Sequence, residues 1–144
     1  MRFLGIDFGT KRIGLAVSDE RGVLAFPKEI VLNDEDTFKR IGVILKEENI
    51  HEIVIGESVD FSGKLNALSA RIEVFILELQ EKFGLPVYKQ KEFLTTVEAR
   101  KSKIGKKGLS PSQAHSKIKQ IKSGRVDASA AALILQRYLD KYNS

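Results

Sequence analysis

The chain has 144 residues, 42% of them hydrophobic, which is enough for one globular domain with a buried core, residues 1–144. It contains no cysteine, so disulfides, zinc–thiolate sites and cysteine nucleophiles are excluded. Neither a signal peptide nor the roughly 18 consecutive apolar residues of a membrane span are found. We therefore expect a cytoplasmic protein with no membrane partner.

The net charge of +5 is concentrated in one segment. Between Glu98 and Arg125 nine basic residues stand against one acid, a net charge of +8, whereas the rest of the chain has a net charge of −3. Glycines and Ser110-Pro111 predict loops in this segment, and basic loops are typical of polyanion binding, although a solvated face is the plain alternative. The candidate phosphate-binding residues here are Arg100, Lys103, Lys106, Lys107 and Arg125.

The first predicted element is a strand from Phe3 to Phe8, an almost continuous apolar run that suits burial on both faces. Asp7 interrupts this run, and a carboxylate in a core strand is costly unless it is paired, hydrogen-bonded or bound to a metal. A turn at residues 9–12 and an antiparallel strand from Ile13 to Val17 follow. Asp7 is thus a candidate functional residue, with capping of the turn as the alternative.

A third strand is predicted from Val23 to Val31, with Pro27 indicating a sheet edge or a bulge. Asn33 is the predicted cap of the next helix, whose early acids favour the positive end of the helix dipole. The apolar face of this helix carries residues three and four apart, namely Phe38, Ile41 and Leu45. A short buried strand over residues 52–56 comes next.

The second half alternates helices with one strand. A long amphipathic helix is predicted from about Ser62 to Phe83, and a fifth strand from Leu85 to Gln90. Helices are then predicted to begin at Thr95 and at Ser110, and a last one to run from about Arg125 to Tyr142. This order predicts an α/β fold with a mixed sheet, antiparallel at first and parallel later, and helices on both faces.

Three acids stand apart from the surface charges. Asp7 ends the first strand, Glu92 follows the fifth strand, and Asp127 opens the last helix just before an alanine cluster. Small side chains let that helix approach the sheet, which would bring Asp127 within reach of Asp7. Clustered carboxylates need a cation, and oxygen ligands without His or Cys favour Mg²⁺ or Mn²⁺. Taken singly, Glu92 could be a surface residue and Asp127 a favourable helix-terminal charge.

The motifs around these acids resemble the YqgF family of RNase-H-like proteins, described as Holliday junction resolvases and as pre-16S ribosomal RNA nucleases. The resemblance runs from end to end and covers Gly5 to Asp19, Glu92 with Leu94 to Ala99, and Val126 to Leu135. It implies an RNase-H-like fold and a hydrolase that cuts phosphodiester bonds, with the family's three acids on Asp7, Glu92 and Asp127. One or two Mg²⁺ or Mn²⁺ ions would be held there.

Two stretches depart from the family pattern. Lys91 and Phe93 replace an acid and an arginine that usually flank the second acid, and Gly56-Glu57-Ser58 replaces Gly-Leu-Pro. The first departure bears on metal or phosphate binding near Glu92. The second adds Glu57 as a secondary candidate at the same edge of the sheet.

By resemblance, we expect the chain to process the ends of pre-16S ribosomal RNA during ribosome biogenesis, with ribosomal precursor particles as partners. Lys11 and Arg12, on the turn beside Asp7, would hold a phosphate, although an exposed turn explains them equally well. Three alternatives stay open: a Holliday junction resolvase on branched DNA, a non-catalytic ribosome-assembly factor that binds nucleic acid, and an actin-like nucleotide-binding module. The sequence decides neither between RNA and DNA nor between monomer and homodimer.

Overall fold

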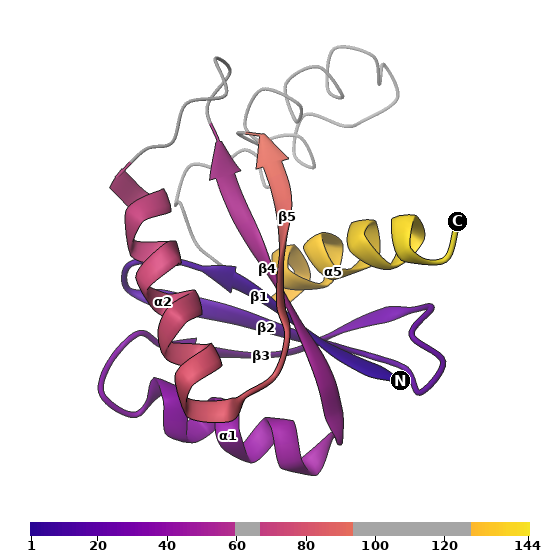
Figure 1. The fold of residues 1–144 in the computed structure, drawn as a ribbon, viewed down its shortest axis with the longest axis horizontal. Helices are drawn as coiled ribbons and strands as arrows, with labels where there is room; N and C mark the ends of the chain where they lie inside the picture. The colour runs from indigo at the N-terminus through magenta and orange to yellow at the C-terminus, as the bar shows by residue number, and fades with distance from the viewer. Residues whose placement is uncertain (60–66, 94–127) are drawn as a thin grey trace, which may run out of the picture.

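The computed structural model describes residues 1–59, 67–93 and 128–144. Its strands form one five-stranded sheet in the order β3-β2-β1-β4-β5 (Figure 1). The strands are β1 (Arg2–Phe8), β2 (Arg12–Ser18), β3 (Ala25–Leu32), β4 (Ile50–Val59) and β5 (Val87–Phe93). The described helices are α1 (Thr37–Glu47), α2 (Ala67–Phe83) and α5 (Ala128–Tyr142).

The pairing of the strands confirms the mixed sheet. β1 pairs antiparallel with β2 and parallel with β4, and β4 pairs parallel with β5. β1 therefore lies in the centre, with a neighbour on each side, as its apolar run predicts. β3 is an edge strand, and its register with β2 shifts where Ala16 meets Pro27, so Pro27 marks both an edge and an irregularity.

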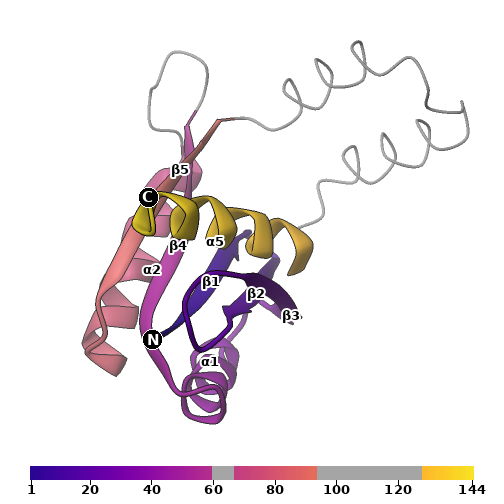
Figure 2. The same cartoon turned by 90° about the vertical axis from the view of Figure 1, so that its right-hand side faces the viewer.

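Side chains alternate between the two faces of the sheet, and each face is covered by different helices. Leu4, Ile6 and Phe8 of β1 join one core cluster with residues of α1 and α2. Phe3 joins a second, smaller cluster with Ala131 and Leu135 of α5. Figure 2 shows α5 on one side of the sheet and α1 and α2 on the other, which confirms helices on both faces.

The start of α1 differs from its prediction. Asn33 does not cap the helix: the N-cap residue is Asp36, and its side chain makes no capping hydrogen bond. Asn33 instead donates from its side chain to the carbonyl of Gly9 and from its backbone to the carbonyl of Lys11, both at 2.9 Å. The predicted apolar face is correct, because Ile41 and Leu45 are buried and Phe38 packs against them.

The remaining elements have the predicted type with shifted ends. β3 begins at Ala25 rather than Val23, because the carboxylate of Asp19 accepts hydrogen bonds from the backbone of Val23 and Leu24 in the preceding turn. β4 is longer than predicted, spanning Ile50–Val59, and α2 ends at Phe83 where Gly84 adopts a φ of +67°. The helices predicted to begin at Thr95 and Ser110 lie outside the described residues.

Among the described helices, none has the length and apolarity required to cross a membrane.

Candidate active site

Asp7 lies at the carboxyl end of the central strand, on the face that α5 covers. It shares this face with Phe3 and Gly5, because residues two apart on a strand point the same way. Its neighbour on β2 is Gly14, which has no side chain to fill the space beside the carboxylate. Asp7 is partly exposed, whereas Ile6 before it is fully buried. Asp7 thus lies at the rim of the core, where solvent reaches part of it.

α5 approaches this strand closely because the facing residues are small. A Cβ atom built on Gly5 would lie 2.7 Å from the Cβ of Leu135 and 3.1 Å from the carbonyl oxygen of Ala131. A Cβ atom on Gly56 would lie 2.6 Å from the Cδ1 of Ile134. Any side chain at Gly5 would therefore push the helix outward. The alanine cluster was predicted to let the helix approach the sheet, and two glycines of the sheet, Gly5 and Gly56, also make this close approach possible.

The direction of α5 brings its beginning toward Asp7. Phe3, near the start of β1, contacts the rings of Tyr138 and Tyr142 near the end of α5. Gly5, further along β1, faces Ala131 instead. The helix thus runs antiparallel to β1, and Ala128 is at the end nearer Asp7. Asp127 itself lies outside the described residues, as do Arg100, Lys103, Lys106, Lys107 and Arg125.

Glu92 is on β5, which is separated from β1 by β4. Its backbone pairs with Ser58 near the ends of β4 and β5, and its side chain is outside the described part. β4 and β5 are both parallel to β1, so the carboxyl ends of all three strands meet at one edge of the sheet. Such an edge is where open α/β sheets bind ligands. The backbone therefore brings the positions of Asp7 and Glu92 to the same edge.

Glu57 does not join Asp7. It alternates along β4 with Gly56, so it points to the face that α2 covers. There its carboxylate is buried and lies 3.5 Å from the amino group of Lys89, which also pairs with Glu73 of α2. The hydrogen bond to Glu73 is the main reason that the pKa of Lys89 is raised. Glu57 is thus part of an ion-pair cluster on the opposite face. The expectation that it is a secondary candidate beside Asp7 is wrong.

Lys11 lies on the loop between β1 and β2, Arg12 is the first residue of β2, and both are exposed. The two hydrogen bonds from Asn33 fasten this loop to the segment before α1. A fixed loop keeps both cations at the same edge of the sheet as Asp7. Sequence reasoning missed this role of Asn33, since an Asn before a helix is usually a cap.

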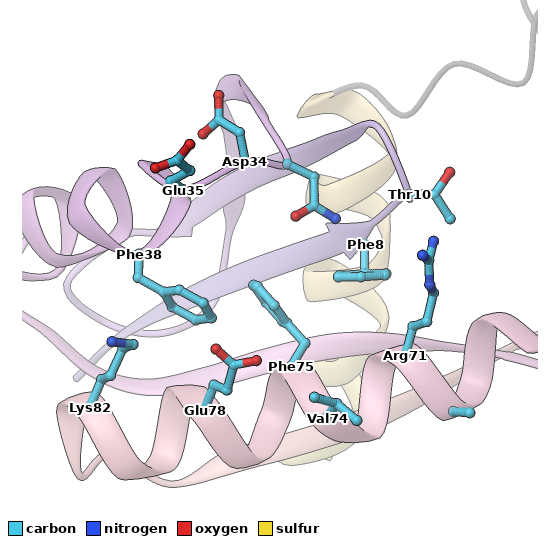
Figure 3. A pocket seen from close by; sticks show the side chains of 12 residues that line it. Phe8, Thr10, Asp34, Glu35, Phe38, Arg71, Val74, Phe75, Glu78 and Lys82 are labelled. Carbon is cyan, nitrogen blue, oxygen red and sulfur yellow. The ribbon is translucent and has the colours of Figure 1, made fainter.

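A pocket of about 720 Å³ opens on the other face of β1 (Figure 3). Phe8, Phe38 and Phe75 line it, with Thr10 and Arg71 at one end. Phe8 follows Asp7 directly and therefore points away from it. The pocket is thus separated from Asp7 by the strand itself.

Within the described part of the chain, no three His, Asp or Glu residues are close enough to hold a metal ion. Two of the three predicted ligands are not among the side chains described there. The metal site accordingly stays a prediction for Asp7, Glu92 and Asp127, and of these side chains the structure describes that of Asp7, on a rim that solvent reaches.

Known proteins resemble the chain along its full length. A family model described as "RuvX: Holliday junction resolvase" matches residues 1–141. The chain belongs to the RuvX family, also called YqgF. A relative from Lactobacillus helveticus is 35% identical, with 97% of this chain and 96% of the relative covered. One from Geobacillus thermodenitrificans is 36% identical, covering 97% and 98%. Both are named "Putative pre-16S rRNA nuclease".

A solved structure supports the fold. T. thermophilus RuvC in complex with Holliday junction substrate matches with a TM-score of 0.51 at 20% identity, covering 100% of this chain and 97% of RuvC. The RNase-H-like fold predicted from the motifs is thereby confirmed. Membership of the RuvX family makes the chain a nuclease, an enzyme that hydrolyses phosphodiester bonds, and nucleases of this fold are typically metal-dependent.

Proposed function

We propose that this RuvX-family chain, as one nuclease domain of residues 1–144, trims the ends of pre-16S ribosomal RNA. The observation that carries the proposal is the position of Asp7, at the edge where three parallel strands end and toward the beginning of α5. The names of the relatives support precursor ribosomal RNA as the substrate. That substrate implies a cytoplasmic location and contact with ribosomal precursor particles.

Asp7, Glu92 and Asp127 are the proposed ligands of one or two Mg²⁺ or Mn²⁺ ions. Asp7 fits this role, because its carboxylate lies on a rim that solvent reaches, beside a glycine, and supplies the hard oxygen atoms that these ions prefer. When bound, such ions activate a water for in-line attack on phosphorus and stabilise the leaving oxygen.

The cationic residues would position the substrate. Lys11 on the fastened loop and Arg12 at the start of β2 are exposed at the edge that carries Asp7, where they would hold a phosphate next to the cleaved bond. Arg100, Lys103, Lys106, Lys107 and Arg125 would follow the phosphate backbone without reading its sequence. Binding should therefore weaken steeply as salt is added.

The proposal is tested by comparing Asp7→Asn with Glu57→Gln. Both remove one carboxylate at the same edge of the sheet, but on opposite faces. With Mn²⁺ and precursor 16S RNA, we expect Asp7→Asn to abolish cleavage while circular dichroism shows a folded protein. Glu57→Gln should keep the parent rate at a temperature where it is folded. Full activity of Asp7→Asn would overturn the assignment.

A second candidate is resolution of four-way DNA junctions, which the description of the family favours. The same two variants assayed on a four-way junction decide between the substrates. A resolvase acting on a two-fold junction should also be a homodimer, which size-exclusion chromatography with light scattering measures.

Binding of both nucleic acids without cleavage over a range of Mn²⁺ would instead favour a non-catalytic assembly factor. Lys91 and Phe93 beside Glu92 are the residues to exchange for the family's acid and arginine in that case.

A further inference from the structure

The chain contains three tyrosines, Tyr88, Tyr138 and Tyr142, and all three lie in one row on the surface. Tyr88 stacks on Tyr138 with ring centroids 5.7 Å apart and planes 20° apart. Tyr138 continues to Tyr142 at 6.1 Å and 21°. The row therefore joins β5, an edge strand, to the second half of α5.

Phe3 supports this row from below. Its ring is fully buried and meets the rings of Tyr138 and Tyr142 at steep angles, with centroids 6.0 Å and 5.4 Å away. The two outer tyrosines are open to solvent: Tyr88 is 39% exposed and Tyr142 is 54% exposed. The fold thus holds roughly parallel aromatic rings in place while leaving part of their surface uncovered.

The charges around the row suit a polyanion. Arg137 and Lys141 each precede one of the helix tyrosines and lie one turn apart on α5, where Arg137 is half-buried and Lys141 exposed. The exposed carboxylate of Asp140 on the same helix accepts a hydrogen bond from Gln136, which also donates to the loop before β3.

The hydroxyl of Tyr138 stays neutral in this setting. Burial, and next the charge of Glu52 on β4, raise its pKa, so it carries no charge near pH 7. Glu52 is half-buried, and its Oε2 is enclosed by the protein rather than turned outward. The outward side of the row is therefore aromatic and cationic.

The row is continuous with the face of the sheet that carries Asp7. Tyr88 pairs with Val54 of β4. Val54 in turn pairs with Gly5 of β1, two residues before Asp7. With strands about 4.8 Å apart and about 3.3 Å per residue, positions 88 and 7 are roughly 12 Å apart. Buried Gln90 follows Tyr88 on β5 toward the edge where the strands end.

We propose that Tyr88, Tyr138 and Tyr142 form a stacking platform for the bases of a single-stranded polynucleotide that extends from the Asp7 edge. Arg137 and Lys141 would contact its phosphates. The platform rests on the proposed function for the choice of nucleic acid as ligand. Stacking on aromatic side chains is tolerant of sequence and is how many proteins hold single strands.

The chain has no tryptophan, so its near-ultraviolet emission comes from these three tyrosines. The test titrates the whole protein, in EDTA, with a short oligouridylate and with an abasic strand of equal length. We expect the oligouridylate to quench tyrosine emission to saturation. The abasic strand, which offers phosphates without bases, should bind at least about fivefold more weakly and leave the emission unchanged.

Variants then separate the ring from the hydroxyl. Tyr88→Leu and Tyr142→Leu should each weaken oligouridylate binding about fivefold or more, whereas Tyr88→Phe and Tyr142→Phe should retain it. Phe26→Leu is the matched control, because Phe26 is 49% exposed on β3 at the other edge of the sheet. Arg137→Gln and Lys141→Gln should each lower the salt slope by about 0.7.

Equal binding of the abasic strand, or an unchanged emission on saturation, would overturn the platform. So would a concentration-dependent change of emission without nucleic acid that parallels dimer formation, because the row would then be a contact between two copies. Binding in EDTA does not require cleavage. A failed cleavage assay with intact quenching would therefore reject the proposed function and keep the platform.

Discussion

The two faces of the sheet are built in opposite ways. On the face under α1 and α2, branched and aromatic side chains fill the space, and Phe75 packs between Phe8 and Phe38 with ring centroids 5.0 Å and 5.1 Å away. On the face under α5, Gly5 and Gly56 leave no such space, and the helix approaches the backbone of the sheet. The first face, which we call the thick face, supplies most of the buried apolar surface. The second, which we call the thin face, is a narrow layer, and Asp7 lies partly exposed at its rim.

This difference places a core residue and a candidate site residue next to each other on one strand. Asp7 and Phe8 are adjacent, yet they point to opposite faces: Phe8 packs into the core, and Asp7 lies at a rim that solvent reaches. Asp7 lies where solvent reaches it, whereas the buried carboxylate of Glu57 on the opposite face is paired with Lys89. The same edge of the sheet thus carries a partly exposed acid on one face and an acid in an internal ion pair on the other.

The largest expected effect is the loss of bulk from the thick face. Leu79 of α2 is fully buried, so Leu79→Ala should lower the free energy of unfolding by about 2–5 kcal/mol. Leu77→Ala, on the same helix but 63% exposed, should change it by about 0.5 kcal/mol or less. Urea unfolding followed by circular dichroism measures both, and similar costs for the two would contradict the packing described for α2.

On the thin face the damaging change is the addition of bulk. Gly5→Ala places a Cβ atom 2.7 Å from the Cβ of Leu135, which cannot rotate away, and should cost about 1–3 kcal/mol. Gly56→Ala meets only the terminal Cδ1 of Ile134, at 2.6 Å, and should cost less because that side chain can turn. Gly5→Ala should also slow metal-dependent cleavage where the protein is still folded, since α5 is displaced near Asp7. Equal costs for the two alanines would show that the helix is not closely seated on β1.

A smaller effect is expected at the contact that links the hairpin to α1. Asn33→Ala removes the side-chain hydrogen bond to Gly9 and should cost about 1 kcal/mol. Hydrogen exchange should become faster in the loop of residues 9–12. Asn143→Ala is the matched control, because Asn143 makes comparable side-chain bonds to Gly22 and Leu139 on the α5 side. In Asn143→Ala, hydrogen exchange in residues 9–12 should be as slow as in the parent protein. Faster exchange there would contradict a local role for Asn33.

The smallest effect is the pH dependence of an ion pair on the α1 side. Arg40 donates from two nitrogens to the carboxylate of Glu29, at 2.8 Å and 2.6 Å, and this lowers the pKa of Glu29 below its ordinary value of 4.5. A lowered pKa stabilises the fold above that ordinary value, and the gain is lost as the pH falls through the folded pKa. The urea midpoint of Glu29→Gln should therefore lie slightly below that of the parent at pH 7 and approach it in acid. A difference that widens in acid would contradict the pairing.

Much of the fold could be predicted because it depends on local patterns. The apolar run around Asp7, the turn at residues 9–12 and the helical spacing from Leu68 to Phe83 each determine an element by themselves. Pro27 was correctly placed at an edge with an irregular register, since proline cannot donate to a neighbouring strand. Asn33 was wrong as a cap, because its hydrogen bonds go to a loop that is distant in sequence.

By itself the sequence determined the order of the described elements, the family and the position of Asp7 on its central strand. The tertiary structure alone decided which acids share a face, because that depends on the register of β4 and β5. It assigned Glu57 to the opposite face and brought Tyr88 against Tyr138, fifty residues further along. Pleat and register convert a one-residue step into a change of face, and no single stretch of sequence contains the pairing that sets them.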